Sequence, residues 1–443
     1  MSITGSGIRV FFLCSILLMM MCGDRGQSLL RGQSMDQYKR EGWYPAGLPL
    51  VNFNSDEGLG YGLKLALFDN GSREDPFFQE SPYFHNVSLL FFQTTGGSRT
   101  FLLESDNPYV GGTRFRLKGQ LLWNQMLNAS YYGIGPADTN RLTDRAGKEY
   151  NTMDEYTRDF LTGDVRNYKY DRYSIVSPEA NVDLYYDISR YFRIRSGVAL
   201  TLAKIDPWGG RSFDIDDGKL DVHENNVVSL PTRLEEDGQD DEEGLVSRII
   251  IGAGFDSRDQ ESDPRKGFLL DYTIEVSSPV TGSEYTYIRH TAESRAYFTP
   301  FQRLTMAFRA AYTTTGHDTP FHMLNTFNFL METQRGLGNN RTLRGYAADR
   351  FIGYTMTCAN AEARIRVIEG NPFNQQLEFQ LVGFIDTGSV YNHPEDPLHE
   401  FDYYHTGYGG GVTVIWNRNF VIHGYYGISR EATTMSLDFG HAF

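Results

Sequence analysis

The side chains of this sequence that could carry chemistry are arginines and carboxylates, since no set of nucleophiles or metal ligands stands out. The chain contains no H-E-x-x-H, G-x-S-x-G or glycine-rich phosphate-binding motif. Its 10 histidines are scattered, and no group of them has the spacing of a metal site. We therefore expect the protein not to be an enzyme and to need neither a metal ion nor another cofactor.

Four segments concentrate charged residues beside glycine, proline and aromatic residues. In the segment 254–272, Asp256, Asp259, Pro264 and Gly267 have the residue types of a tight turn between two strands. The charges of such a turn are more often capping and solvated groups than a functional site. The four segments are SDNPYVGGTRFRLKGQLLWN (105–124), GFDSRDQESDPRKGFLLDY (254–272), RGLGNNRTLRGYAADRFIG (335–353) and GFIDTGSVY (383–391).

Composition limits the kind of protein that could position these segments. The 443 residues have a formal net charge of −15, which argues against nucleic acid as a partner. Three cysteines are too few for a disulfide framework, and the chain after residue 28 lacks the roughly 18 consecutive apolar residues of a membrane-spanning helix. The 45 glycines, 30 phenylalanines and 28 tyrosines favour many strands. A membrane β-barrel fits these numbers, because its apolar face takes only every second residue.

The N-terminus has the features of an export signal. Arg9 precedes an uninterrupted apolar run, VFFLCSILLMMMC (10–22), which is too short to span a membrane comfortably as a helix. We expect a signal peptide over 1–28, followed by a linker or short plug over 29–47. In the alternative interpretation, Cys22 is a lipid-modified N-terminus.

The rest of the chain alternates between apolar and polar residues. In 113–124, for example, Phe115 and Leu117 lie on one face of an extended strand while Arg116 and Lys118 lie on the other. A soluble sandwich alternates as well, but its strands average about 5–6 residues, whereas many of those here run for 10–15 residues. The polar faces also carry opposite charges, as the wall of a wet lumen would.

We therefore predict an all-β fold, a single 16-stranded antiparallel transmembrane β-barrel over 48–443. The turn 96–98 is expected among the periplasmic connections. The long connections expected outside the cell are 126–171, 205–245, 315–351 and 388–406. The expected strands are 48–54, 59–69, 84–95, 99–107, 112–125, 172–187, 190–204, 246–256, 266–277, 285–298, 303–314, 352–367, 374–387, 407–416, 420–428 and 432–443.

The quoted segments and their places in this strand order resemble the BamA/TamA superfamily of outer-membrane barrels, also called the bacterial surface antigen family. The resemblance covers the whole expected barrel, 48–443. The aromatic Phe443 matches the C-terminal signal typical of outer-membrane barrels. The residues that match the family's [V/I/L]-R-G-[F/Y] motif, in the long loop between strands 11 and 12, are Leu343, Arg344, Gly345 and Tyr346.

The resemblance implies that this loop folds inward, where Arg344 meets acidic residues on the inner wall of strands 12 and 13. The matching positions are Glu362 and Asp386, and both also lie on the inward face by alternation. An arginine suits this task because its planar guanidinium pairs with carboxylates through several donors at once. Gly345 leaves room where the loop packs against the wall, and Tyr346 supplies an aromatic anchor with a polar end.

The resemblance also implies a function and a location. The protein would be integral to the outer membrane of a Gram-negative-type bacterium, surrounded by the lipids of that membrane. It would insert or export unfolded outer-membrane or secreted polypeptides through a lateral seam between its first and last strands. Family members that do so usually carry periplasmic POTRA domains, whereas only 29–47 precedes the barrel here, so a separate periplasmic partner is expected. The alternative is a loop-plugged pore or a surface scaffold without assembly activity.

Overall fold

The computed structural model describes most of the chain after residue 40. The expected signal peptide over 1–28 and the lipid attachment at Cys22 lie outside the described residues. Those residues are 41–54, 58–78, 81, 83–136, 141–143, 148–156, 172–207, 211–216, 219–224, 234, 243–370, 377–401, 403–416, 420–439 and 441–443.

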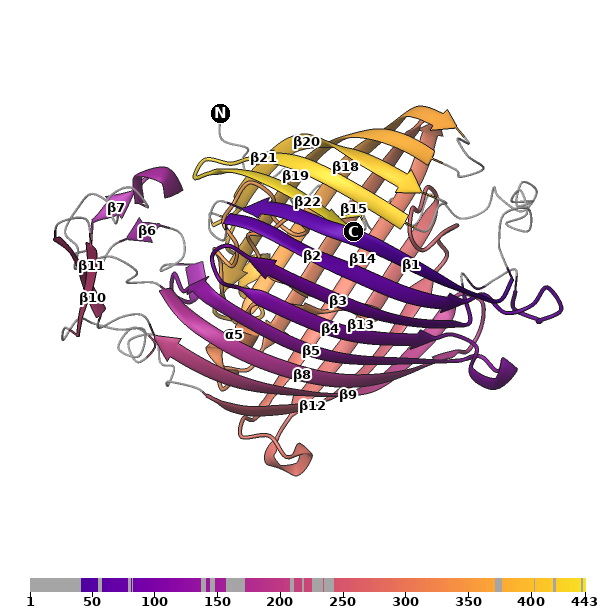
Figure 1. Cartoon of the computed structure of the whole chain (residues 1–443), viewed down its shortest axis with the longest axis horizontal. Helices are drawn as coiled ribbons and strands as arrows, with labels where there is room; N and C mark the ends of the chain where they lie inside the picture. The colour runs from indigo at the N-terminus through magenta and orange to yellow at the C-terminus, as the bar shows by residue number, and fades with distance from the viewer. Residues whose placement is uncertain are drawn as a thin grey trace.

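One antiparallel sheet of 16 strands dominates the described residues, and each strand pairs with the strand before it in the sheet order (Figure 1). In that order the strands are β1 (Trp43–Asn54), β2 (Gly58–Asp69), β3 (His85–Thr94), β4 (Arg99–Asn107), β5 (Phe115–Ser130), β8 (Arg172–Asp187), β9 (Phe192–Pro207), β12 (Gly244–Asp256), β13 (Gly267–Ser277), β14 (Tyr287–Phe301), β15 (Leu304–Thr315), β18 (Thr355–Gly370), β19 (Leu377–Tyr391), β20 (His405–Trp416), β21 (Phe420–Ile428) and β22 (Thr433–Phe439).

Within the connections, the described residues form three short hairpins and a few helical turns. No helix among the described residues is long and apolar enough to cross a membrane. The loop after β15 contains the short helix α5 (Phe321–Leu324). The hairpins pair β6 (Leu142–Thr143) with β7 (Glu149–Tyr150), β10 (Arg211–Asp216) with β11 (Lys219–Glu224), and β16 (Thr326–Asn328) with β17 (Thr333–Arg335).

The two faces of the sheet differ in a way that is the reverse of a soluble protein. In β13, Leu270 and Tyr272 are 37% and 45% exposed, whereas Asp271, Thr273 and Glu275 between and beyond them are buried. A soluble fold would bury the leucine and the tyrosine and expose the charges. Here an apolar face points outward and a polar face is covered, as expected for a sheet with lipid outside and a polar interior.

The two edges of the sheet, β1 and β22, lie beside each other (Figure 1). β1 pairs with β2 along its whole length of 12 residues, whereas β22 pairs with β21 from Thr433 to Phe439. The sheet order runs from β1 to β22 and includes no ladder that joins these two strands among the described residues. The sheet therefore curls until its free edges meet side by side.

The structure corrects the expected start of the barrel. β1 begins at Trp43 rather than at residue 48, so the last five residues of the expected linker belong to the strand. Pro45 and Pro49 obscure this strand in the sequence, because proline lacks the N–H of a regular ladder. An edge strand tolerates proline better than a central strand does, because one of its sides has no ladder to maintain.

The structure contradicts the prediction that the turn 96–98 and the connection 126–171 lie on opposite sides of the membrane. The Asn128 side chain, at the far end of β5, donates a hydrogen bond to the Gly96 carbonyl at 3.0 Å. The turn therefore lies at the same end of the sheet as the long connection after β5. Since antiparallel strands alternate in direction, the turn after an odd-numbered strand of the sheet must share that end.

The last strand is shorter than the expected 432–443. It ends at Phe439, and the described residues after it, 441–443, are buried on the polar face. Phe443 therefore does not continue the outward apolar pattern of the strand. Its ring lies beneath two arginine side chains, Arg309 and Arg364, with 5.1 and 5.6 Å from guanidinium carbon to ring centroid.

Candidate functional site

The connection between β15 and β18, residues 316–354, lies on the polar face of the sheet and is called the long loop here. Its apolar side chains pack with residues of the wall, so the contact is more than a set of ion pairs. The buried cluster at this contact consists of Ala311, Phe327, Phe329, Leu337, Leu343, Tyr346, Phe351, Met356, Cys358 and Val390. Leu343, the first residue of the predicted motif, is fully buried in it.

Arg344 is held by Glu362 and Asp386, the two carboxylates predicted from the sequence. Its Nε and Nη2 donate to the two oxygens of Asp386 at 2.7 and 2.8 Å, and its Nη1 donates to Oε1 of Glu362 at 2.6 Å. Its main-chain N–H donates to Asp386 as well, at 3.1 Å. The guanidinium carbon lies 3.5 Å from the ring centroid of Phe384 and 4.7 Å from that of Tyr425. Burial opposes the charge, but Asp386 and Glu362 raise the pKa of Arg344 above its ordinary value.

Two further side chains, Asn360 and Arg364, donate hydrogen bonds to the oxygens of these two carboxylates. Asn360 donates to Asp386 at 2.8 Å and also to the Thr342 carbonyl of the long loop at 2.7 Å. Arg364 donates to the second oxygen of Glu362 at 2.8 Å and to the main-chain oxygen of Phe443 at 3.2 Å. Buried charges are tolerated when they are paired and hydrogen-bonded in this way. The network therefore runs from the loop through the wall to the end of the chain.

Glycines let the main chain of the loop pack directly on the wall. Gly345 has a φ of +96°, and a Cβ there would lie 2.8 Å from the main chain of Ile428. On the facing wall, a Cβ on Gly407 would lie 1.8 Å from the Arg344 carbonyl oxygen, and one on Gly427 would lie 2.7 Å from the Gly345 nitrogen. Sequence reasoning named Gly345 and missed both wall glycines, although β20 and β21 are visibly rich in glycine.

Tyr346 lies beside Arg344 and is buried against two other rings. Its ring centroid is 5.1 Å from that of Phe351 and 5.8 Å from that of His405, both in edge-on contact. Its hydroxyl donates to the Thr406 carbonyl at 3.4 Å, and burial raises the pKa of Tyr346 to about 12. The side chain thus combines an apolar contact with one hydrogen bond to β20.

A second buried arginine of the loop holds the last hairpin of the sheet, and sequence reasoning missed it. Arg350 donates through Nε and Nη2 to the two oxygens of Glu431, in the β21–β22 turn, at 2.9 and 3.3 Å. In the same region, Ser429 donates to the Gly345 carbonyl at 2.7 Å and the Gly345 N–H donates to Thr434 at 3.0 Å. The long loop therefore contacts the strand at the free edge as well as β18 and β19.

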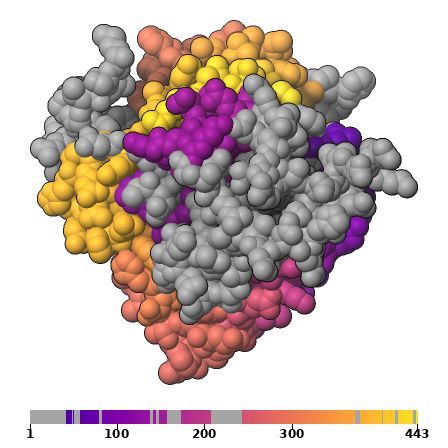
Figure 2. Space-filling model, turned by 90° about the vertical axis from the view of Figure 1, so that its left-hand side faces the viewer, coloured from indigo at the N-terminus to yellow at the C-terminus, as the bar shows by residue number. Residues whose placement is uncertain are grey.

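The long connection after β5 covers the same corner. Met153 donates its main-chain N–H to the Glu431 carbonyl at 2.9 Å, and the Arg350 guanidinium carbon lies 5.2 Å from the Tyr132 ring centroid. Figure 2 shows the described part of this connection, in purple, beside the yellow C-terminal hairpin. Glu431 is thus held from two sides by connections that are far apart in the sequence.

The β16–β17 hairpin, in the N-terminal half of the long loop, contacts strands other than those that bind Arg344 and Arg350. Arg195 of β9 donates to the Asn328 side chain at 3.1 Å and to the Phe329 carbonyl at 2.9 Å. Arg295 of β14 donates to Glu332 at 2.5 Å. Together with the contacts of Arg344 and Arg350, these bonds stretch the loop from β9 and β14 to the β21–β22 turn.

The predicted turn residues lie between β12 and β13 and do not meet Arg344. Asp259 caps the turn by accepting from the main-chain nitrogens of Arg265 and Lys266 at 2.9 and 3.2 Å. Asp256 accepts from the Arg258 guanidinium at 2.9 and 2.8 Å. Gly267 has a φ of +108°, and a Cβ there would lie 2.4 Å from the Ser257 carbonyl oxygen. Pro264 is buried within the same turn.

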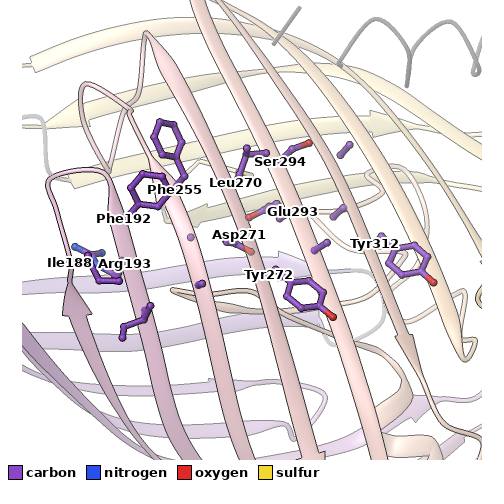
Figure 3. A pocket seen from close by; sticks show the side chains of 16 residues that line it. Ile188, Phe192, Arg193, Phe255, Leu270, Asp271, Tyr272, Glu293, Ser294 and Tyr312 are labelled. Carbon is purple, nitrogen blue, oxygen red and sulfur yellow. The ribbon is translucent and has the colours of Figure 1, made fainter. Parts of the chain in front are cut away.

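A small-molecule or metal site would be indicated by a cluster of metal ligands or by a pocket among the described residues. They include no group of three or more histidine, cysteine, aspartate or glutamate side chains that could hold a metal ion. An open, mostly apolar depression lies across the wall from β9 to β15, and Figure 3 shows Phe192, Phe255, Tyr272 and Tyr312 among the side chains that line it. These rings belong to the apolar outward face, so the depression is separate from the Arg344 network.

The outward apolar face and the loop seated on the polar face are those of an outer-membrane β-barrel protein. Residues 88–421 match the Omp85 superfamily domain, and the chain belongs to that superfamily. The match confirms the resemblance drawn from the sequence and makes this an integral protein of the outer membrane. Residues 30–84 match a domain of unknown function, DUF5982. No curated protein sequence matches the chain significantly.

Solved structures show the same fold at low sequence identity. BamA from Haemophilus ducreyi lacking POTRA domains 1-3 is 13% identical with a TM-score of 0.51, over 91% of this chain and 70% of that chain. CdiB from Escherichia coli is 10% identical with a TM-score of 0.53, over 91% of this chain and 63% of that chain. This chain thus spans less than two thirds of CdiB.

Proposed function

We propose that this protein inserts or exports other polypeptides at the outer membrane through the seam between β1 and β22. The observation that carries the proposal is the pair of free edges that lie side by side without a described ladder. An unpaired strand edge offers N–H and C=O groups in the spacing that an incoming strand needs. Membership of the Omp85 superfamily supports the proposal, because the resemblance above implies the same activity.

In this proposal the 16 strands close into one barrel, and the long loop is the plug of its lumen. The loop contacts β9 and β14 through its hairpin and β18, β19 and the β21–β22 turn through Arg344 and Arg350. A loop held at both ends would block a steady passage for solutes. The client would therefore use the seam rather than the lumen, and a separate periplasmic partner would deliver it.

Depletion of the protein followed by profiling of the outer membrane and of secreted proteins tests this function. We expect a selective loss of other barrels or of exported polypeptides, because the seam would no longer be offered to them. An unchanged profile, together with a large steady conductance of the purified protein in planar bilayers, would instead establish a passive pore.

Locking the seam tests the mechanism. Cysteine pairs placed between 48–54 of β1 and 433–437 of β22, in a Cys358→Ser background, are expected to abolish function when oxidised and to restore it when reduced. The matched control is Ala46→Cys with Ala66→Cys, which joins two directly opposed residues of the β1–β2 ladder. This control should keep full function in both states. Full activity with an oxidised seam contradicts the mechanism.

A further inference from the structure

The β12–β13 connection, residues 257–266, meets the segment that follows the last strand. Nε2 of His441 lies 2.9 Å from Oδ1 of Asp263, and the two residues are only 7% and 3% exposed. A carboxylate only accepts hydrogen bonds, so Nε2 of His441 carries a proton and donates the hydrogen bond to Asp263. This contact plays no part in the Arg344 network or in the seam as described so far.

The wall supports Asp263 in this position. Arg265 donates to Asp263 at 3.3 Å and to Glu378 of β19 at 2.7 Å. Gln380, also on β19, donates to Glu378 at 2.8 Å. The carboxylate that receives His441 is therefore tied to β19 through its neighbours.

The same connection also reaches toward the other side of the sheet. Oε1 of Glu261 lies 3.7 Å from Nη1 of Arg116 on β5, and Asp106 of β4 holds that arginine through two bonds of 2.7 and 2.6 Å. In the sheet order, β5 and β19 are separated by seven strands. The connection therefore leaves the edge formed by its own strands and extends across the polar face.

The segment after β22 is held on that face by further contacts. Ala442 is fully buried, and its carbonyl oxygen accepts from Arg309 at 3.5 Å. Phe443 packs in a buried cluster that includes Tyr297 and Ala307. The segment thus turns away from the ladder of the last strand and into the interior, where Asp263 meets its first described residue.

We propose that the β12–β13 connection is a latch, in which Asp263 receives His441 and so holds the segment after β22 against the interior wall. The latch restrains the last strand, because a strand whose end is pinned inside cannot swing away from its neighbour. Its importance for the client rests on the proposed function of the seam. The latch itself depends only on the contacts given above.

Thiol labelling tests the latch without any client polypeptide. With Ala442→Cys as the reporter in a Cys358→Ser background, we expect slow reaction with a maleimide in the folded protein. His441→Ala removes the donor, and Asp263→Asn replaces the charged acceptor by a neutral, weaker amide oxygen, so each variant should speed the labelling at least about tenfold by releasing the segment. Asp187→Asn is the matched control, since it breaks an ion pair with Arg193 (2.5 Å) on the same face that includes neither Asp263 nor His441.

Hydrogen exchange of the last strand provides a second measurement that does not need the reporter cysteine. The amides of 433–439 are expected to exchange faster in His441→Ala, with no change in Asp187→Asn. Labelling and exchange that match the parent protein in both latch variants would overturn the proposal. A latch that these measurements confirm would stand even if the oxidised seam retained full activity, so the two proposals fail separately.

Discussion

Replacing Arg344 by alanine is expected to unseat the long loop and to lower the heat resistance of the barrel markedly. The change leaves Asp386 and Glu362 buried on the polar face without the cation that pairs with both of them. Removing one partner of a buried ion pair typically costs about 3–5 kcal/mol, because the remaining charge is uncompensated. The temperature at which the protein loses its compact mobility on semi-native gels measures the effect.

Two further variants show whether the geometry of the pair matters or only its charge. Arg344→Lys keeps the charge but loses the bidentate contact, so we expect an intermediate loss of heat resistance. Arg99→Ala removes an exposed arginine at the start of β4 and should leave the mobility unchanged. An Arg344→Ala protein with the mobility and folded fraction of the parent would show that the seating of the loop does not depend on this ion pair.

Replacing Gly407 by alanine is expected to displace the same loop without changing any charge. The added Cβ would lie 1.8 Å from the Arg344 carbonyl oxygen, which is main chain and cannot rotate away as a side chain could. Overpacking of this kind typically costs about 1–3 kcal/mol. Limited proteolysis of the long loop, read by mass spectrometry, should show faster cleavage within 335–353 than in the parent.

Gly383→Ala in the adjacent strand β19 is the control for Gly407→Ala. A Cβ at Gly383 meets nothing within 4 Å, so this variant reports only what an alanine does in a strand of this wall. Arg344→Ala and Gly407→Ala are both expected to act by displacing the long loop. Their effects on stability should therefore be far from additive when the two changes are combined. Equal cleavage rates for Gly407→Ala and Gly383→Ala would refute the direct packing of loop on wall.

Most of the strands, and the kind of protein they make, could be predicted from the sequence. A strand between lipid and a polar interior must alternate with a period of two, so Leu270 and Tyr272 can be assigned to one face and Asp271 to the other without any tertiary information. The motif around Arg344, together with the inward positions of Glu362 and Asp386, also named three residues that the structure brings together.

The contacts that these elements make across the interior could not be predicted from the sequence. Arg350 and Glu431 are 81 residues apart, and Asp263 and His441 are 178 apart, so no local pattern links either pair. The close approach of Gly407 to the loop is equally invisible to alternation, which assigns a face to a residue but not a partner on the opposite side. Such contacts depend on how far the sheet curls and where each connection turns inward, and the whole set of strand registers fixes these together.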